Sequence, residues 1–190
     1  CIIGGASNNG TNVLEWLRSS VFASEHSTER FLLQAVNIQP GAEGLHFLPY
    51  IHGERAPLWD AQATGAFYGL TTQHGQAHFV RAAMEGVLYN LKLIAEGINI
   101  QVQIDSLHAG GGFSQNHLWV QMLADIFQRP VLIRDGGVDA SVFGAIQLGR
   151  SVLGLKPLIQ TTRDKVFQPN TANRAVYENA YRQFRKGISV

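Results

Sequence analysis

A run of three glycines, Gly110 to Gly112, most constrains how this chain can fold, because it lies between an apolar stretch and an amphipathic pattern. Glycine lacks a Cβ and readily adopts positive φ angles, so the backbone can turn sharply there and lie close to another molecule. The helix predicted after it, from Asn116 to Phe127, would present its free N–H groups and its positive dipole end to the turn. Such a turn suits an anion or the flat edge of a nucleotide, and it is equally typical of a plain strand-to-helix connection.

Hydrophobic periodicity along the chain predicts helices that alternate with short strands. The longest pattern runs from Gln76 to Gly97, and its apolar stripe includes Leu88 and Leu91. Two more helices are predicted near the N-terminus, near 12–22 with Asn12 or Thr11 as N-cap and at 27–36 with Ser27 or Thr28 as N-cap. A helix at 140–148 would have Asp139 as its N-cap and would end at Gly149. A last helix is predicted at 172–186, with its inward side chains at Val176, Tyr177, Ala180, Tyr181 and Phe184. Strands are predicted within 41–60, at 104–109 and at 130–133. This alternation is typical of α/β layers.

The composition restricts the classes of function. The chain has 190 residues, of which 45% are hydrophobic, so it is long enough for one domain with a core, residues 1–190. Its net charge of +1 and its lack of a basic run argue against nucleic acid as a partner. Its apolar runs are far shorter than the roughly 20 residues of a membrane helix. A single cysteine, Cys1, suits a reducing compartment, so a cytoplasmic protein is expected.

The first residues do not resemble the start of a protein. Cys1 stands where an initiator methionine would be, and residues 1–5 have the pattern of a strand entered midway. The same stretch lacks the basic region and the long apolar region of a secretory signal peptide. We therefore expect the chain to be a piece of a longer protein.

Two common phosphate-binding fingerprints are absent around the glycine turn. A dinucleotide-binding turn would need a third glycine at position 115, where the chain has Gln115. A P-loop would need a lysine between a glycine and a Ser or Thr, and no lysine of the chain has these neighbours. A hydride-transfer enzyme with a nicotinamide cofactor and a P-loop kinase are therefore both disfavoured.

Two groups of polar residues admit both a functional and a structural interpretation. His74 and His78 have the i, i+4 spacing that lets two histidines share a metal, but no third ligand is evident, so no metal site is predicted. Glu54 and Arg55 lie in a loop rich in glycine and proline. They could hold a substrate, but we favour an ion pair that fixes the loop.

Four segments carry a combined pattern: PYIHGERAP at 49–57, GAFYGL with HFVRAAME seven residues later at 65–85, GGF with LWVQMLAD and RPV at 111–131, and DAS with Gly144-Ala145 at 139–145. In this order, over about residues 1–155, they resemble the FGGY family of carbohydrate kinases. Within that family, gluconate kinases resemble the chain most, and xylulose kinases come second.

The resemblance implies a ribonuclease-H-like, actin-like ATPase fold of the α/β class. The chain would be the C-terminal, nucleotide-binding domain, incomplete at its N-terminus. It also implies ATP and Mg²⁺ as cofactors and a sugar or sugar acid, gluconate first, as the phosphate acceptor. By this resemblance, Gly111 and Gly112 would let the nucleotide lie against the backbone, and Asn116 would bond its adenine or ribose. Gly10 would lie in a glycine-rich turn near the α- and β-phosphates.

The catalytic aspartate of the family matches none of Asp60, Asp105, Asp125 and Asp139, and the resemblance places it before Cys1. No catalytic residue is therefore assigned, and the chain alone is expected to be inactive, since phosphoryl transfer needs a group that orients the nucleophile. Two other interpretations stay open, a xylulose kinase and a non-catalytic actin-like nucleotide-binding module. A homodimer also stays open, because missing leading strands would leave a sheet edge unpaired.

Overall fold

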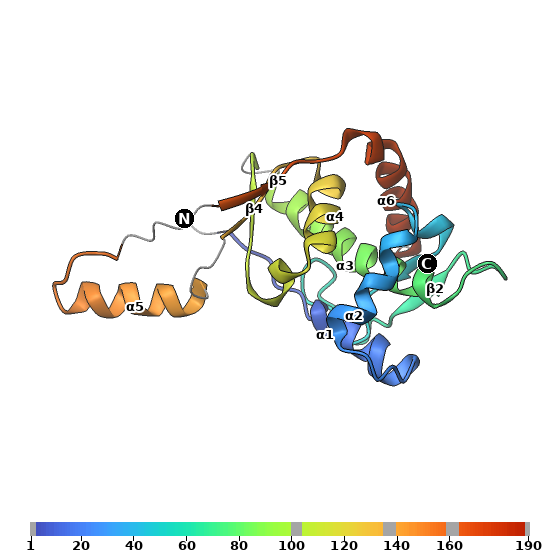
Figure 1. Ribbon diagram of the computed structural model, residues 1–190, viewed down its shortest axis with the longest axis horizontal. Coiled ribbons are helices and arrows are strands. Elements are labelled where there is room, and N and C mark those ends of the chain that lie inside the picture. The colour runs from blue at the N-terminus through green and yellow to red at the C-terminus, as the bar shows by residue number, and fades with distance from the viewer. Residues whose placement is uncertain (1–2, 100–103, 135–139, 159–163, 189–190) are drawn as a thin grey trace.

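The computed structural model describes residues 3–99, 104–134, 140–158 and 164–188, and most of them gather around one long helix, α3 (Figure 1). The helices are α1 (Thr11–Trp16), α2 (Thr28–Leu32), α3 (Gln76–Asn99), α4 (His117–Phe127), α5 (Ala140–Val152) and α6 (Arg174–Ile188). The strands are β1 (His46–Leu48), β2 (Ala66–Tyr68), β3 (Leu107–Ala109), β4 (Val131–Arg134) and β5 (Asp164–Phe167). Short turns of 3₁₀ or π geometry join them: η1 (Leu17–Val21), η2 (Leu33–Asn37), η3 (Ala42–Gly44), η4 (Gly111–Gln115) and η5 (Thr171–Asn173).

Helix α3 is the central element, and it begins at Gln76 as the periodicity predicts. Its apolar stripe is buried, with Met84 and Leu88 fully enclosed. Strand β1 and helices α1, α2, α4 and α6 all contact it. Leu91 departs from the prediction, because its side chain is 36% exposed although the period places it on the inner face.

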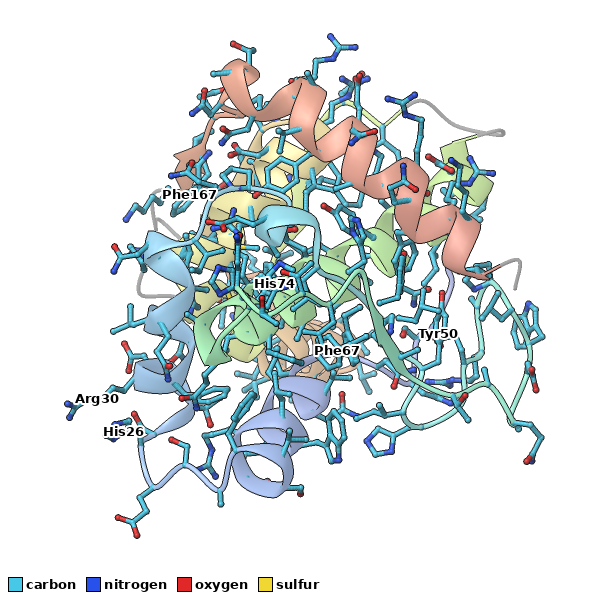
Figure 2. All side chains as sticks on the ribbon, turned by 90° about the vertical axis from the view of Figure 1, so that its right-hand side faces the viewer. His26, Arg30, Tyr50, Phe67, His74 and Phe167 are labelled. Atoms are coloured by element: carbon cyan, nitrogen blue, oxygen red, sulfur yellow. The ribbon has the colours of Figure 1, made fainter. Side chains whose placement is uncertain are left out.

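Helix α3 and strand β1 approach each other closely at Gly86. A Cβ built on Gly86 would lie 2.3 Å from the carbonyl oxygen of Phe47, so only glycine leaves room for this contact. The ring of Phe47 stacks on Phe67 with 4.2 Å between centroids, and Phe67 meets Phe79 edge-on at 4.8 Å (Figure 2). These stacked and edge-on rings stabilise the packing of α3 against strands β1 and β2.

The described strands form two small sheets. Strands β1 and β2 pair antiparallel, with Phe47 opposite Phe67. In the other sheet β4 lies between β3 and β5, parallel to β3 and antiparallel to β5. The predicted strand at 104–109 is shorter than expected, since pairing covers only Leu107–Ala109, and β2 and β5 were not foreseen. The mixture of helices with a partly parallel sheet confirms the α/β class.

The glycine triplet makes the predicted turn between β3 and α4. Gly110 is extended, whereas Gly111 has a φ of +69°, in the left-handed region that glycine adopts without strain. Asn116 caps α4, because its Oδ1 accepts a hydrogen bond of 3.0 Å from the backbone N–H of Trp119. The chain therefore leaves β3, turns once through η4 and enters α4 with a polar cap at its start.

Helices α1 and α2 lie beside each other at the lower edge of the molecule in Figure 1. Ser27 caps α2, as predicted, by accepting a hydrogen bond from the backbone N–H of Arg30. The predicted cap of α1 is wrong, because Gly10 occupies the N-cap position. The Oδ1 atom of Asn12 accepts a hydrogen bond of 2.7 Å from the backbone N–H of Gly10, so it supports the turn before the helix.

Helix α5 projects from the body on its own (Figure 1). Its predicted end at Gly149 is wrong, since the helix continues to Val152 and the positive φ of Gly154, +67°, follows its last turn. A single glycine inside a helix costs about 1 kcal/mol and does not stop it. Asp139, its predicted N-cap, lies outside the described residues. None of the helices in the described ranges is long and apolar enough to cross a bilayer.

The C-terminal segment is fastened to α4 by Asp125, a buried carboxylate. It accepts hydrogen bonds of 2.8 Å from the backbone N–H of Asn170 and of 2.7 Å from the side-chain amide of Asn173. Helix α6 then packs along α4 and α3. Four of its predicted inward side chains are buried, but Val176 is 45% exposed, because the neighbouring elements cover a narrower face than the period allows.

Candidate functional site

A pocket of about 260 Å³ lies between the start of α1, the start of α2 and the glycine turn before α4. Two successive helices and a turn much further along the chain therefore meet at one place. The pocket is lined by Thr11, Leu14, Thr28, Glu29, Leu32, Gly112, Gln115, Asn116 and Trp119.

The floor of the pocket is apolar and buried. Leu14, Leu32 and Trp119 line it, and their side chains are 0, 4 and 1% exposed. The indole Nε1–H of Trp119 donates a hydrogen bond of 3.0 Å to the carbonyl oxygen of Met84 in α3. The Phe113 ring packs against the indole, with 4.7 Å between centroids. An apolar floor with a polar rim suits an aromatic base.

The glycine turn forms an open wall of this pocket. A Cβ built on Gly111 or Gly112 would meet no described atom within 4 Å, so the space beside the backbone is free for a ligand. Asn116 stands at the same wall with its Oδ1 engaged in the helix cap. Its amide N–H₂ group has no acceptor among the described residues, and it can donate to a ligand.

Glu15 ties α1 to α2 and so fixes the opposite wall. Its carboxylate accepts hydrogen bonds of 3.0 Å from Nε of Arg18 and of 2.6 Å from the hydroxyl of Thr28. The hydrogen bond from Arg18, followed by that from Thr28, lowers the pKa of Glu15 to about 2. Thr28 is thereby held at the rim of the pocket.

The structure brings the predicted nucleotide-binding residues to this one region. Gly112 and Asn116 line the pocket, and Gly111 immediately precedes Gly112. Gly10 immediately precedes Thr11, which lines the pocket from the other side. Thr28, Glu29 and Leu32 were missed, because no motif or spacing in the sequence links α2 to the distant glycine turn.

The glycine-rich turn before α1 is held by bonds within the chain. The backbone N–H of Asn8 donates to Glu54, that of Asn9 to the hydroxyl of Ser7, and that of Gly10 to Asn12. These three N–H groups are therefore engaged. The space beside the Gly10 backbone is open, since a Cβ there would meet only an Asn12 oxygen at 3.9 Å.

Glu54 is the anchor of that turn. This buried carboxylate accepts hydrogen bonds of 2.7 Å from Ser7 Oγ, 3.0 Å from the backbone N–H of Asn8 and 2.7 Å from the side-chain amide of Asn90 in α3. The predicted ion pair between Glu54 and Arg55 is wrong. The exposed Arg55 side chain instead donates from Nε to the Asn8 Oδ1 atom at 2.8 Å, because adjacent residues of the turn point apart.

The two histidines lie at the start of α3, with 5.3 Å between ring centroids. His74, labelled in Figure 2, accepts a hydrogen bond at Nδ1 from the backbone N–H of Thr71. His78 Nε2 lies 3.5 Å from a carboxylate oxygen of Glu43. Within the described ranges, no group of three or more His, Cys, Asp or Glu side chains could hold a metal ion.

Comparison with known proteins agrees with the motifs. Residues 2–151 match the model of the FGGY family of carbohydrate kinases, C-terminal domain. The chain is 36% identical to a gluconokinase of Bacillus licheniformis, over 97% of this chain and 38% of that protein. It is 35% identical to a xylulose kinase of Staphylococcus epidermidis, over 88% of this chain and 35% of that protein. The chain thus spans less than two fifths of the length of these relatives.

A solved structure, the gluconate kinase from Lactobacillus acidophilus, superimposes with a TM-score of 0.84 at 33% identity, over 96% of this chain and 38% of that one. A ligand-bound xylulose kinase from the same organism matches equally well, with a TM-score of 0.84. These likenesses confirm the ribonuclease-H-like, actin-like ATPase fold. The family match, the relatives and the shared fold agree: this chain belongs to the FGGY family of carbohydrate kinases and carries its C-terminal domain.

Proposed function

We propose that residues 1–190 are the nucleotide-binding domain of an ATP-dependent carbohydrate kinase. The observation that carries this proposal is the pocket at the glycine turn, where an apolar floor, an open backbone wall and the free amide of Asn116 converge. Adenine would lie on the floor formed by Leu14, Leu32 and Trp119. Gly111 and Gly112 would let it lie against the backbone.

In this proposal the chain binds and orients the nucleotide, while ATP supplies the transferred phosphate. Asn116 donates to the base or ribose through its amide, and Gly10 leaves space beside Thr11 for the α- and β-phosphates. Mg²⁺ is included as the partner of the phosphates, since magnesium in such enzymes is held largely by substrate phosphates. The described residues provide no carboxylate cluster of their own for it.

The catalytic base is proposed to lie outside this chain, so the chain alone would be inactive. Transfer needs an oriented hydroxyl with a base within reach. None of the described aspartates lines the pocket. We propose gluconate as the acceptor because a gluconokinase is among the most similar relatives, at 36% identity. Xylulose is the second candidate, since a xylulose kinase follows at 35%.

The proposal is tested by measuring ADP release from ATP by the natural protein that carries this chain, with gluconate or xylulose as the acceptor. Turnover that depends on gluconate is expected to exceed turnover with xylulose. A reversed preference would assign the second candidate. ATP binding without turnover on any sugar would instead favour a non-catalytic actin-like module.

Gly112→Val is expected to weaken ADP binding at least 100-fold, because a branched side chain would fill the space proposed for the nucleotide. The fold should tolerate it, since no described atom lies within 4 Å of a Cβ at this position. Gly110→Val is the matched control, because Gly110 also has open space and extended backbone but does not line the pocket. Calorimetry that gave the two variants the same ADP affinity would refute this position for the nucleotide.

A further inference from the structure

The charge at the pocket beside the glycine turn is negative. Of the described residues that line it, only Glu29 has a charged side chain. Glu29 lies at the exposed start of α2, and no described residue donates a hydrogen bond to it or forms an ion pair with it. Arg30, the next residue, extends away from the body (Figure 2). The Glu29 carboxylate is therefore an uncompensated acceptor at the pocket rim.

An anionic rim determines which part of a nucleotide can lie there. Phosphate groups would be repelled by the carboxylate, and no lysine or arginine among the described residues lines the pocket to hold them. The apolar base belongs on the buried floor with Trp119, where it loses contact with water. The part left at the rim is the sugar of the nucleotide, which carries hydroxyl donors and tolerates partial exposure.

The other polar side chains that line the pocket, Thr11, Thr28, Gln115 and Asn116, are neutral and so weaker acceptors than a carboxylate, and two of them are already engaged within the protein. The hydroxyl hydrogen of Thr28 is given to Glu15, and Oδ1 of Asn116 already accepts from the backbone of α4. Ribose hydroxyls need acceptors, and an ionised carboxylate only accepts. Two oxygens of one carboxylate can take the two neighbouring hydroxyls of a ribose, and dinucleotide-binding folds also use a carboxylate to accept from the ribose 2′-hydroxyl.

We propose that Glu29 selects ribonucleotides by accepting hydrogen bonds from the 2′- and 3′-hydroxyls of the bound nucleotide. This inference rests on the proposed nucleotide site and identifies Glu29 as the group that binds the ribose of the nucleotide. It also sets the orientation of the ligand, with the base on Trp119 and the phosphates leaving the pocket away from α2.

The test compares calorimetric affinities for ADP and for 2′,3′-dideoxyadenosine diphosphate, in the natural protein that carries this chain. The unmodified protein is expected to bind ADP about tenfold more tightly, the usual size of a hydrogen bond to a charged group. Glu29→Ala should lower ADP affinity about tenfold, leave the dideoxy analogue unchanged and so abolish the preference. Glu29→Gln, which keeps the shape of the side chain, should lose most of it.

Glu25→Ala is the matched control, since Glu25 is an exposed glutamate close by in the sequence that does not line this pocket. It should keep the full preference for ADP. A preference that survives Glu29→Ala and Glu29→Gln, or equal weakening of both ligands, would overturn the role of Glu29 while leaving the nucleotide site in place. Failure of the unmodified protein to bind either ligand would overturn the proposed function as well.

Discussion

Replacing Glu85 by alanine is expected to lower the free energy of unfolding by about 3–5 kcal/mol, because it leaves a buried guanidinium without its counter-charge. Glu85 is 1% exposed and accepts hydrogen bonds of 2.7 Å from Arg81 Nε and of 3.0 Å from the backbone N–H of Gly41. Arg81 is 4% exposed and also donates to the hydroxyl of Tyr177 at 2.6 Å. Burial raises the pKa of Glu85, and Arg81 opposes that shift. The pair thus connects α3, the η3 turn and α6.

Denaturant unfolding of Glu85→Ala provides the measurement, and the chain contains a matched control. Arg174 and Glu178 in α6 have the same i, i+4 spacing and the same 2.7 Å distance, but their side chains are 64% and 51% exposed. Glu178→Ala should change stability barely at all, because water screens an exposed pair. The double variant Arg81→Met with Glu85→Leu should recover much of the loss, since it leaves no charge buried. Equal losses from the buried and the exposed pair would contradict this account.

Leu88→Ala is expected to cost about 2–5 kcal/mol, because it leaves a cavity at the centre of the core. Leu88 is fully buried in α3, between the strand pair and the other helices. For a chain of this size each kcal/mol corresponds to about 2–4 °C of melting temperature. Thermal unfolding followed by circular dichroism would measure the shift.

Leu91→Ala, three residues further along the same helix, is the control for this prediction. Leu91 is 36% exposed, so its truncation removes less buried surface and should lower the melting temperature by less than half as much. If the two variants had the same melting temperature, the interior of the fold would not be centred on Leu88. If Leu88→Ala left stability unchanged but altered sugar binding, α3 would be a binding surface.

The elements with long periodic patterns were predictable, and the short ones were not. Gln76 begins α3 and the Asn116 region begins α4, because many apolar positions repeat there with one period. Strands β2 and β5 have three and four residues, and the first three residues of β5 are exposed, so no alternation could reveal them. Leu91 and Val176 fit their periods yet are exposed, since a period does not show how wide a face the neighbours cover.

The candidate site was predictable only where its residues belong to a motif that resembles the FGGY family. Gly112 and Asn116 belong to one local motif, which the resemblance to the FGGY family assigns to the nucleotide, so their joint presence at a pocket wall was predictable. Glu29 comes to the pocket through the packing of α2 beside α1, which no local pattern encodes. Glu54 shows the same limit, because the side-chain donors that hold its carboxylate include Ser7 and Asn90, far away in the sequence. Its neighbour Arg55 donates to it only from the backbone N–H, while the Arg55 guanidinium bonds to Asn8.

The close approach at Gly86 has a consequence for anyone who engineers this domain for greater stability. Replacing a helix glycine by alanine usually contributes about 1 kcal/mol through backbone entropy, which makes the two glycines of α3 obvious targets. At Gly97 no described atom lies within 4 Å of the added methyl group, so the gain is available. At Gly86 the methyl group would collide with the Phe47 carbonyl, and helix and strand would have to separate. The same exchange in the same helix therefore has opposite signs, and thermostabilising libraries should vary Gly97 and keep Gly86 fixed.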